Sequence, residues 1–175
     1  MKTIKRLALA LLFAAVATAA EAQIKIPGTK VSFQFPNGGW KYLHTTKVDD
    51  NTSVYLYSYN ERYVIDSVGD TVLPFMRIYV HRNYQGSAYE AAYSRFLSQP
   101  FQSLDEYVDG LPSAGGIGYL GAYTNETDGK DYEFRMIYFK ERSTLLEIRL
   151  ETTRDNYDDF EEEFKSILRS VKINK

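Results

Sequence analysis

The side chains that most often carry catalysis are scarce in this sequence. Its 175 residues include two histidines, His44 and His81, and no cysteine. Thiol enzymes, zinc fingers and iron–sulfur sites are therefore excluded, because each needs cysteine. A zinc site on the two histidines would need both rings on one face of a sheet and carboxylates as further ligands, and no metal-ligand spacing is present. We predict no metal site and no cofactor.

No local motif for nucleophilic catalysis is present either. The sequence lacks the Gly-x-Ser-x-Gly turn that exposes a catalytic serine in α/β-hydrolases. Hydrolysis by a pair of carboxylates stays open, because 23 acidic residues form many pairs and only their separation in space decides. However, Glu133, Glu147 and Glu151 are expected on the solvated face of a hairpin. We predict that the protein is not an enzyme and assign no catalytic residue, with a carboxylate-based hydrolase as the weaker alternative.

A run of glycines at residues 116–121 matches the spacing of a dinucleotide-binding loop. That function needs a strand before the glycines and a helix after them, whose amino end holds the pyrophosphate. Turn residues follow here instead of a helix. We predict a glycine-rich strand or loop in which the backbone packs closely.

Tyrosines gather on one face of a predicted strand over residues 54–59. Alternation places Tyr55, Tyr57 and Tyr59 on the same side. The return strand of the following hairpin carries further aromatic and basic side chains, and tyrosine and arginine are the residues that anchor interfaces. The candidate binding residues are Tyr55, Tyr57, Tyr59, Phe75, Arg77, Tyr79 and His81. The alternative is that a helix covers this face and the tyrosines are ordinary packing.

The periodicities predict an α+β fold, an α/β/α sandwich with a central antiparallel sheet of about six or seven strands. Two main helices are expected at residues 87–98 and 155–171. Ser87 and Glu90 have the spacing of a capping box, and Asp155 is the expected cap of the second helix. Strands are expected at residues 31–35, 40–47, 54–59, 75–82, 117–123, 131–140 and 144–152.

Charge pairing suggests a register for the last hairpin. With a loop at residues 140–142, Arg135 would lie across from Glu147 and Glu133 across from Arg149. The charged residues would then occupy one face. The opposite face would hold Tyr132, Phe134, Met136, Leu146, Ile148 and Leu150.

The first 22 residues resemble a secretory signal peptide. Basic residues precede an apolar run over residues 7–20, and small residues precede a predicted cleavage after Ala22. We expect a single domain over residues 23–175, without a membrane span and without the cysteine that a lipoprotein needs. The expected location is periplasmic or secreted. The net charge of −2 argues against a basic nucleic-acid binder.

The chain resembles the PsbP-like family, which includes a Ran-binding nuclear import factor and many bacterial secreted proteins. The strand at residues 31–35 runs into Pro36-Asn37-Gly38-Gly39-Trp40, similar to the family's Pro-x-Gly-Trp opening. The closing hairpin and helix ending at residues 170–173 are also similar. The resemblance implies an α/β/α sandwich and members that mostly bind other proteins. The metal-associated histidines of the plant member have no match here.

These observations favour an accessory or assembly factor that binds another envelope protein through an aromatic surface. The alternative is a module that binds a small ligand or glycan on the tyrosine-rich face. Ser67 and Thr71 each follow an aspartate in a pattern typical of bacterial O-glycosylation. Whether either hydroxyl is modified, and which protein or ligand binds, is open at this level.

Overall fold

The computed structural model describes residues 23–60, 64–107, 111–112 and 115–174. The predicted signal peptide, residues 1–22, lies outside these ranges, so its removal stays a prediction. Over the part of the chain that is described, no helix is long and apolar enough to cross a membrane.

The largest sheet has seven strands within the described ranges, and every neighbouring pair is antiparallel, as predicted. Its hydrogen-bonded order is β3 (Trp40–Lys47), β4 (Thr52–Tyr59), β7 (Phe75–His81), β11 (Thr144–Thr153), β10 (Asp131–Glu141), β9 (Ile117–Thr124) and β8 (Ser103–Tyr107).

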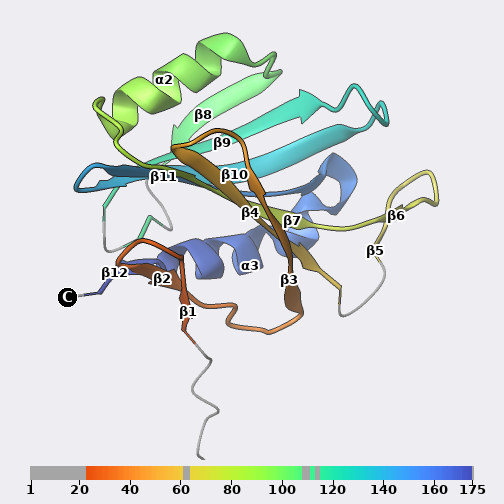
Figure 1. The fold of residues 1–175 in the computed structure, drawn as a ribbon. Helices are drawn as coiled ribbons and strands as arrows, with labels where there is room; N and C mark the ends of the chain where they lie inside the picture. Colours follow the sequence, from red (N-terminus) through yellow and green to blue (C-terminus); the bar gives the residue numbers. More distant parts are fainter. Residues whose placement is uncertain (1–22, 61–63, 108–110, 113–114, 175) are drawn as a thin grey trace, which may run out of the picture.

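Helices α2 (Ala88–Ser98) and α3 (Tyr157–Arg169) cover opposite faces of this sheet, which confirms the predicted sandwich (Figure 1). Helix α2 begins with the predicted capping box, in which Ser87 and Glu90 each accept a hydrogen bond from the other's backbone N–H. Helix α3 begins later than predicted, because a 3-10 turn, η1 (Arg154–Asn156), precedes it. Asp155 is not its cap. The Asp155 carboxylate instead accepts a hydrogen bond from the backbone N–H of Ser67.

Two smaller sheets flank the main one. In the described residues, the first contains β1 (Ile24–Lys25), β2 (Val31–Phe33) and β12 (Lys172–Ile173), and it lies beside α3 in Figure 1. Because β2 pairs with both other strands, it joins the beginning of the described chain to its end. The second contains β5 (Val64–Ile65) and β6 (Thr71–Val72).

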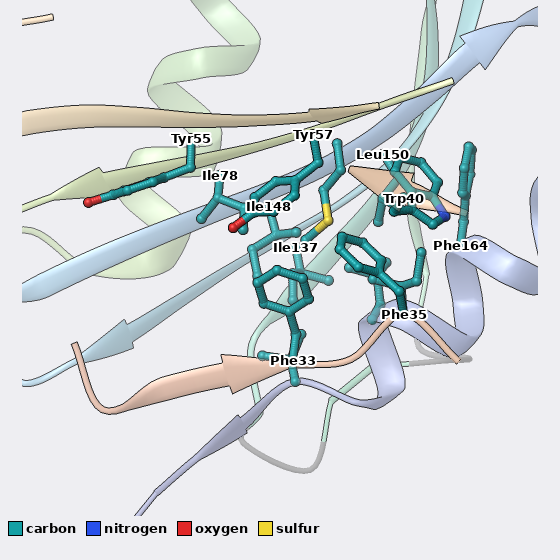
Figure 2. Close-up of a cluster of buried hydrophobic side chains, with 14 of the residues drawn as sticks. Phe33, Phe35, Trp40, Tyr55, Tyr57, Ile78, Ile137, Ile148, Leu150 and Phe164 are labelled. Carbon is teal, nitrogen blue, oxygen red and sulfur yellow. The ribbon is translucent and has the colours of Figure 1, made fainter. Parts of the chain in front are cut away.

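An aromatic cluster fills the space between the sheet and α3 (Figure 2). The ring of Phe35 stacks on Trp40 with centroids 5.4 Å apart, and the Trp40 ring lies 6.2 Å from Phe164 of α3. Phe33 is fully buried and meets Tyr57 edge to face at 5.6 Å. The Trp40 indole N–H also donates a 2.6 Å hydrogen bond to Glu163. The N-terminal segment and α3 therefore close this face of the sheet together.

The β10–β11 hairpin has a different register from the predicted one. Arg135 lies opposite Leu150, and Phe134 lies opposite Glu151. The turn is the two-residue loop Arg142-Ser143, entered with Arg142 at a φ of 55°, and not the predicted loop at residues 140–142. The observed register differs from the predicted one by an odd number of residues. Because side chains alternate between the two faces of a strand, residues of β10 and β11 that were predicted on opposite faces therefore share one face. The α2 face therefore holds Phe134, Met136, Tyr138, Glu147, Arg149 and Glu151.

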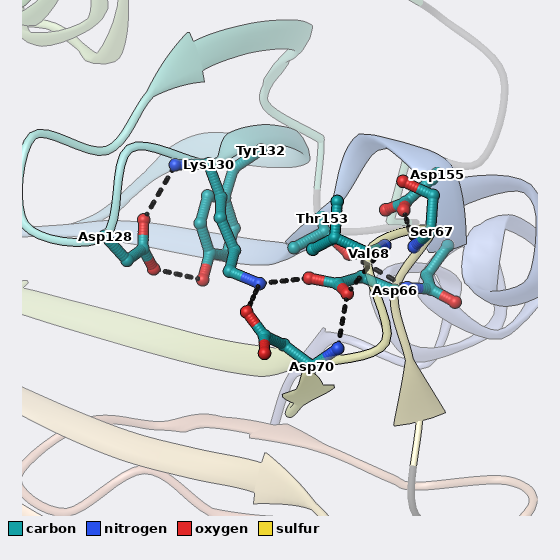
Figure 3. A network of polar contacts seen from close by, with 10 residues as sticks. Asp66, Ser67, Val68, Asp70, Asp128, Lys130, Tyr132, Thr153 and Asp155 are labelled. Atoms are coloured by element: carbon teal, nitrogen blue, oxygen red, sulfur yellow. Dashed lines mark hydrogen bonds and ion pairs between the residues drawn. The ribbon is translucent and has the colours of Figure 1, made fainter.

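A polar network fastens the β5–β6 hairpin to the main sheet (Figure 3). The Lys130 ammonium, just before β10, pairs with Asp66 and Asp70 at the two ends of the hairpin turn. These hydrogen bonds lower the pKa of Asp66 and raise the pKa of Lys130. Ser67 and Thr71 are exposed residues of this hairpin, and their modification stays a prediction.

Candidate functional site

The predicted aromatic patch is divided between the two faces of the sheet. Tyr55 lies opposite Ile78 and Tyr57 lies opposite Met76, so the tyrosines of β4 point toward α3. Tyr55, Tyr57 and Tyr59 are only 7–8% exposed and belong to the aromatic core (Figure 2). The prediction of an exposed tyrosine face is therefore wrong, and the alternative of ordinary sandwich packing describes these side chains.

The other predicted residues, Phe75, Arg77, Tyr79 and His81, alternate with buried residues of β7 and lie half-buried on the α2 face. The rings of Tyr79 and His81 are stacked with centroids 6.2 Å apart. A ring nitrogen of His81 lies 3.2 Å from the Thr52 hydroxyl, and burial lowers the pKa of His81. Their role in binding stays a prediction.

The two histidines share the α2 face but do not meet. In the strand register, His44 of β3 lies opposite Leu56 of β4, and Leu56 lies opposite Arg77 of β7. His81 lies four residues beyond Arg77 along β7. That offset is about 13 Å along the strand direction. The described residues contain no group of three or more metal-ligating side chains.

Helix α2 exposes a row of large apolar side chains. Tyr89, Tyr93, Phe96 and Leu97 are 45–68% exposed, and the rings of Tyr89 and Tyr93 are stacked with their planes 7° apart. Beside them lies a groove of about 280 Å³ between α2 and strands β8 and β9. We call it the α2 groove, and it is lined by Tyr89, Ala92, Tyr93, Phe96, Leu104, Glu106 and Tyr119.

The contact between α2 and the sheet explains why these rings stay outside. The helix meets the sheet through Ala92, its buried residue, which packs against Phe134, Met136 and Tyr138 of β10. One turn further along, Arg95 reaches the sheet and pairs with Glu147 at 3.0 Å. Since a methyl group and a polar side chain make this contact, the large rings of the helix remain at the surface.

Buried charges lie on the sheet next to this contact. Arg149 and Glu151 of β11 are almost fully buried, and Arg149 Nε lies 2.6 Å from a Glu151 oxygen. Arg77 pairs with the other oxygen of the same carboxylate. The Arg149 guanidinium lies 4.5 Å from the Phe134 ring centroid and 4.7 Å from that of Tyr123. We call Arg77, Arg149 and Glu151 the arginine cluster.

Arg77 and Arg149 of the arginine cluster line the floor of an open cavity of about 680 Å³. Its walls come from the chain after α2 and from the turn between β9 and β10. This cavity shares no lining residue with the α2 groove.

The glycine run at residues 116–121 is not a dinucleotide loop. Most of the run lies within β9. A turn and strand β10 follow it, and not the helix that a dinucleotide-binding loop needs. A Cβ atom on Gly121 would lie 2.5 Å from the Phe134 ring, and one on Gly118 would lie 2.6 Å from Tyr107. The prediction that the backbone packs closely there is confirmed.

An antiparallel sheet held between α2 and α3, with the N-terminal strands packed beside α3, is a PsbP-like fold. CyanoP, the PsbP of Synechocystis sp. PCC 6803, matches it with a TM-score of 0.50 at 14% identity over 90% of this chain and 95% of that one. LpqN of Mycobacterium tuberculosis, described as involved in cell envelope biogenesis, matches with a TM-score of 0.54 at 13% identity over 89% and 91%. The resemblance read from the sequence is confirmed as a fold.

A protein of Bacteroides thetaiotaomicron VPI-5482 is similar as well, with a TM-score of 0.55 and 10% identity. The match covers 89% of this chain but 49% of that one, so this chain spans about half of its length. No family model and no curated protein matches the chain. At these identities the likeness concerns the fold alone.

Sequence reasoning predicted helix α2 but not the exposure of its large apolar side chains. Periodicity identifies which side chains share a helix face, and it does not identify what that face contacts. A signal for a polar sheet surface was present on β11, where Glu147, Arg149 and Glu151 alternate with the apolar residues Ile148 and Leu150. Placing them on the face under α2 would have predicted a polar surface there.

Proposed function

We propose that this protein is a non-catalytic accessory factor of the cell envelope, which binds another envelope protein through the α2 groove. One observation carries the proposal, namely the row of four exposed apolar side chains on α2 beside that groove. Aromatic side chains are enriched at protein interfaces, because they bury a large rigid area at low entropic cost. A contiguous apolar patch on a surface is typical of a binding site.

The surroundings of the groove suggest the chemistry of the partner. Glu106 of β8 lines the groove and is exposed, as is Glu90 near the start of α2, whereas Arg95 points to the sheet and pairs with Glu147. Strand β8 ends the main sheet in the described residues, so its outer edge offers backbone groups to a further strand. We therefore propose an extended apolar segment flanked by lysine or arginine as the occupant.

A location outside the cytoplasm is part of the same proposal. It is supported by the signal-peptide pattern of residues 1–22 and by the likeness to LpqN, which is described as involved in cell envelope biogenesis. The location is tested by the N-terminal sequence and the cell fractionation of the protein made by its native cell.

A crosslinking capture experiment tests the binding surface. The tagged protein is crosslinked in its native cells, its partners are identified, and the strongest is purified and titrated against the protein. The variant Tyr93→Ala/Phe96→Ala removes two groove rings, and we expect it to weaken binding by about 100-fold or more, as for hot-spot residues.

The matched control is Leu43→Ala/Val48→Ala, which removes two side chains that are 45% and 61% exposed at the β3 end of the sheet. We expect it to bind the partner like the native protein. Equal binding by the native protein and the groove variant, with both shown to be folded, would refute the α2 groove as the binding surface.

A further inference from the structure

We infer that the cavity above the arginine cluster is a second binding site, which takes a small organic anion and pairs its carboxylate or phosphate group with Arg77 and Arg149. The inference is independent of the α2 groove, because the two sites share no lining residue. It concerns a ligand, and the proposed function concerns a protein partner.

The cavity has the volume of a ligand site. Its volume of about 680 Å³ lies in the range of about 300–1,000 Å³ that is typical of small-molecule pockets. Arg77 and Arg149 lie at its floor, and the exposed residues Thr124, Glu126 and Thr127 form part of its rim. A ligand that enters from solvent would therefore meet the half-buried Arg77 first, with the more deeply buried Arg149 beside it.

The hydrogen-bonding capacity of the two arginines exceeds what their partner accepts. Each guanidinium carries five N–H donors, and both share the single carboxylate of Glu151. One oxygen of that carboxylate also accepts a 3.3 Å hydrogen bond from the Tyr123 hydroxyl. The side chain of Arg149 is 9% exposed, so few of its donors are reached by bulk water. A ligand with two or three acceptor oxygens would satisfy them.

The charges of the floor also favour an anion. On this face three arginines, Arg77, Arg95 and Arg149, lie near two carboxylates, Glu147 and Glu151, which leaves one positive charge. Burial and the nearby charge of Arg77 lower the pKa of Arg149, which marks a cation that is incompletely compensated. Glu126 is exposed on the rim, where water and salt screen its charge.

Rings beside the arginines provide a surface for the rest of the ligand. Tyr79, Phe101 and Tyr123 line the cavity together with Pro100. The guanidinium of Arg149 lies over Tyr123, which holds its plane in place and fixes the direction of its remaining donors. A charged floor under aromatic and proline walls fits a sugar acid, a sugar phosphate or a similar small ring that carries an anionic group.

Calorimetric titration of the purified protein with glucuronate, glucose 6-phosphate and methyl glucoside tests the inference. We expect binding of at least one of the two anions at millimolar concentration or below, and binding of the neutral glucoside at least about tenfold weaker. The carboxylate and phosphate probes distinguish the two forms of the anionic group.

Two variants locate the site. Arg77→Gln leaves Glu151 paired with Arg149 and should weaken anion binding by about tenfold or more. Thr127→Trp places a bulky group on the exposed rim and should weaken binding without touching the floor. The charge-matched control is Arg142→Gln in the exposed β10–β11 turn, which should bind like the native protein.

The inference is overturned if neither anion binds the native protein at millimolar concentration, or if Arg77→Gln binds as tightly as the native chain. The groove variant Tyr93→Ala/Phe96→Ala should retain anion binding. Failure of the protein-partner proposal and failure of this one are therefore separable.

Discussion

The two faces of the main sheet differ in polarity and in how completely their helix covers them. The face toward α3 is apolar and closed, because α3 and the strands β1, β2 and β12 pack an aromatic cluster against it. The face toward α2 carries the arginine cluster, and its helix touches it through Ala92 and Arg95. The large apolar side chains of α3 are buried against the first face, whereas Tyr89, Tyr93, Phe96 and Leu97 of α2 stay exposed, although the sheet residues Phe134, Met136 and Tyr138 are buried beneath that helix. The difference indicates that stability comes mainly from one face and that the other is available for binding.

The largest effect is expected from the α3 face. Phe164→Ala removes a fully buried ring that contacts Trp40, Tyr157 and Phe160, and it should lower the free energy of unfolding by about 3–5 kcal/mol. Phe96→Ala on α2 should change it by less than about 0.5 kcal/mol. Urea unfolding of both variants makes the comparison. Similar losses for the two would contradict the division between the faces.

The buried charges of the α2 face should also matter for stability. Glu151→Gln removes the carboxylate shared by Arg77 and Arg149, and we expect a loss of about 3 kcal/mol, because the buried Arg149 and the half-buried Arg77 lose their partner. Denaturant unfolding measures it, with Glu126→Gln on the exposed rim as the control. A loss below about 1 kcal/mol would show that the cluster is well hydrated and weakly coupled.

Removing the N-terminal cap of α2 should have the next largest effect on the free energy of unfolding. Ser87→Ala removes the capping side chain, and we expect a loss of about 1 kcal/mol. Hydrogen exchange should show faster exchange in α2, with α3 unchanged. Ser87→Asp keeps an acceptor at the cap and should preserve most of the stability. Equal acceleration in both helices would mean that α2 does not open independently of the core.

The smallest effect concerns pH. Burial lowers the pKa of His81, so the unfolded chain binds a proton that the folded protein resists. Stability should therefore fall as the pH drops below about 6.5, by less than about 1 kcal/mol because His81 is only half-buried. His81→Gln should weaken this dependence, and His44→Gln, at an exposed position, serves as the control. An unchanged dependence in His81→Gln would assign it to other groups.

Most elements of the fold were predictable from the sequence, because they have clear local signals. An exception is the edge strand β8, Ser103–Tyr107, which the sequence did not predict. Alternation identified the long strands, and the capping box of Ser87 and Glu90 marked the start of α2. The start of α3 was placed too early, because Asp155 looks like a cap in sequence while its carboxylate binds the distant backbone of Ser67. Such a contact has no local signature.

The candidate sites were harder to predict, because they depend on which face each strand presents. The turn after β10 has no Asn-Gly or similar signal, and a non-glycine residue, Arg142, adopts the positive φ. The sequence therefore favours a longer loop, and the pairing of surface charges predicts a register that the structure contradicts. That register placed Arg149 and Glu151 in solvent and hid the arginine cluster. The burial of Tyr55 and Tyr57 depends on α3 and the N-terminal strands, which local periodicity does not place.

Site-specific photocrosslinking in native cells tests the central claim most directly. A photoreactive phenylalanine analogue is placed at Phe96 in the α2 groove, and separately at Leu43 on β3 as an equally exposed control. We predict one discrete adduct with another envelope protein from position 96 and none with that protein from position 43. The same adduct from both positions, or an adduct from position 43 alone, would contradict the claim that the α2 face is the binding face of this protein.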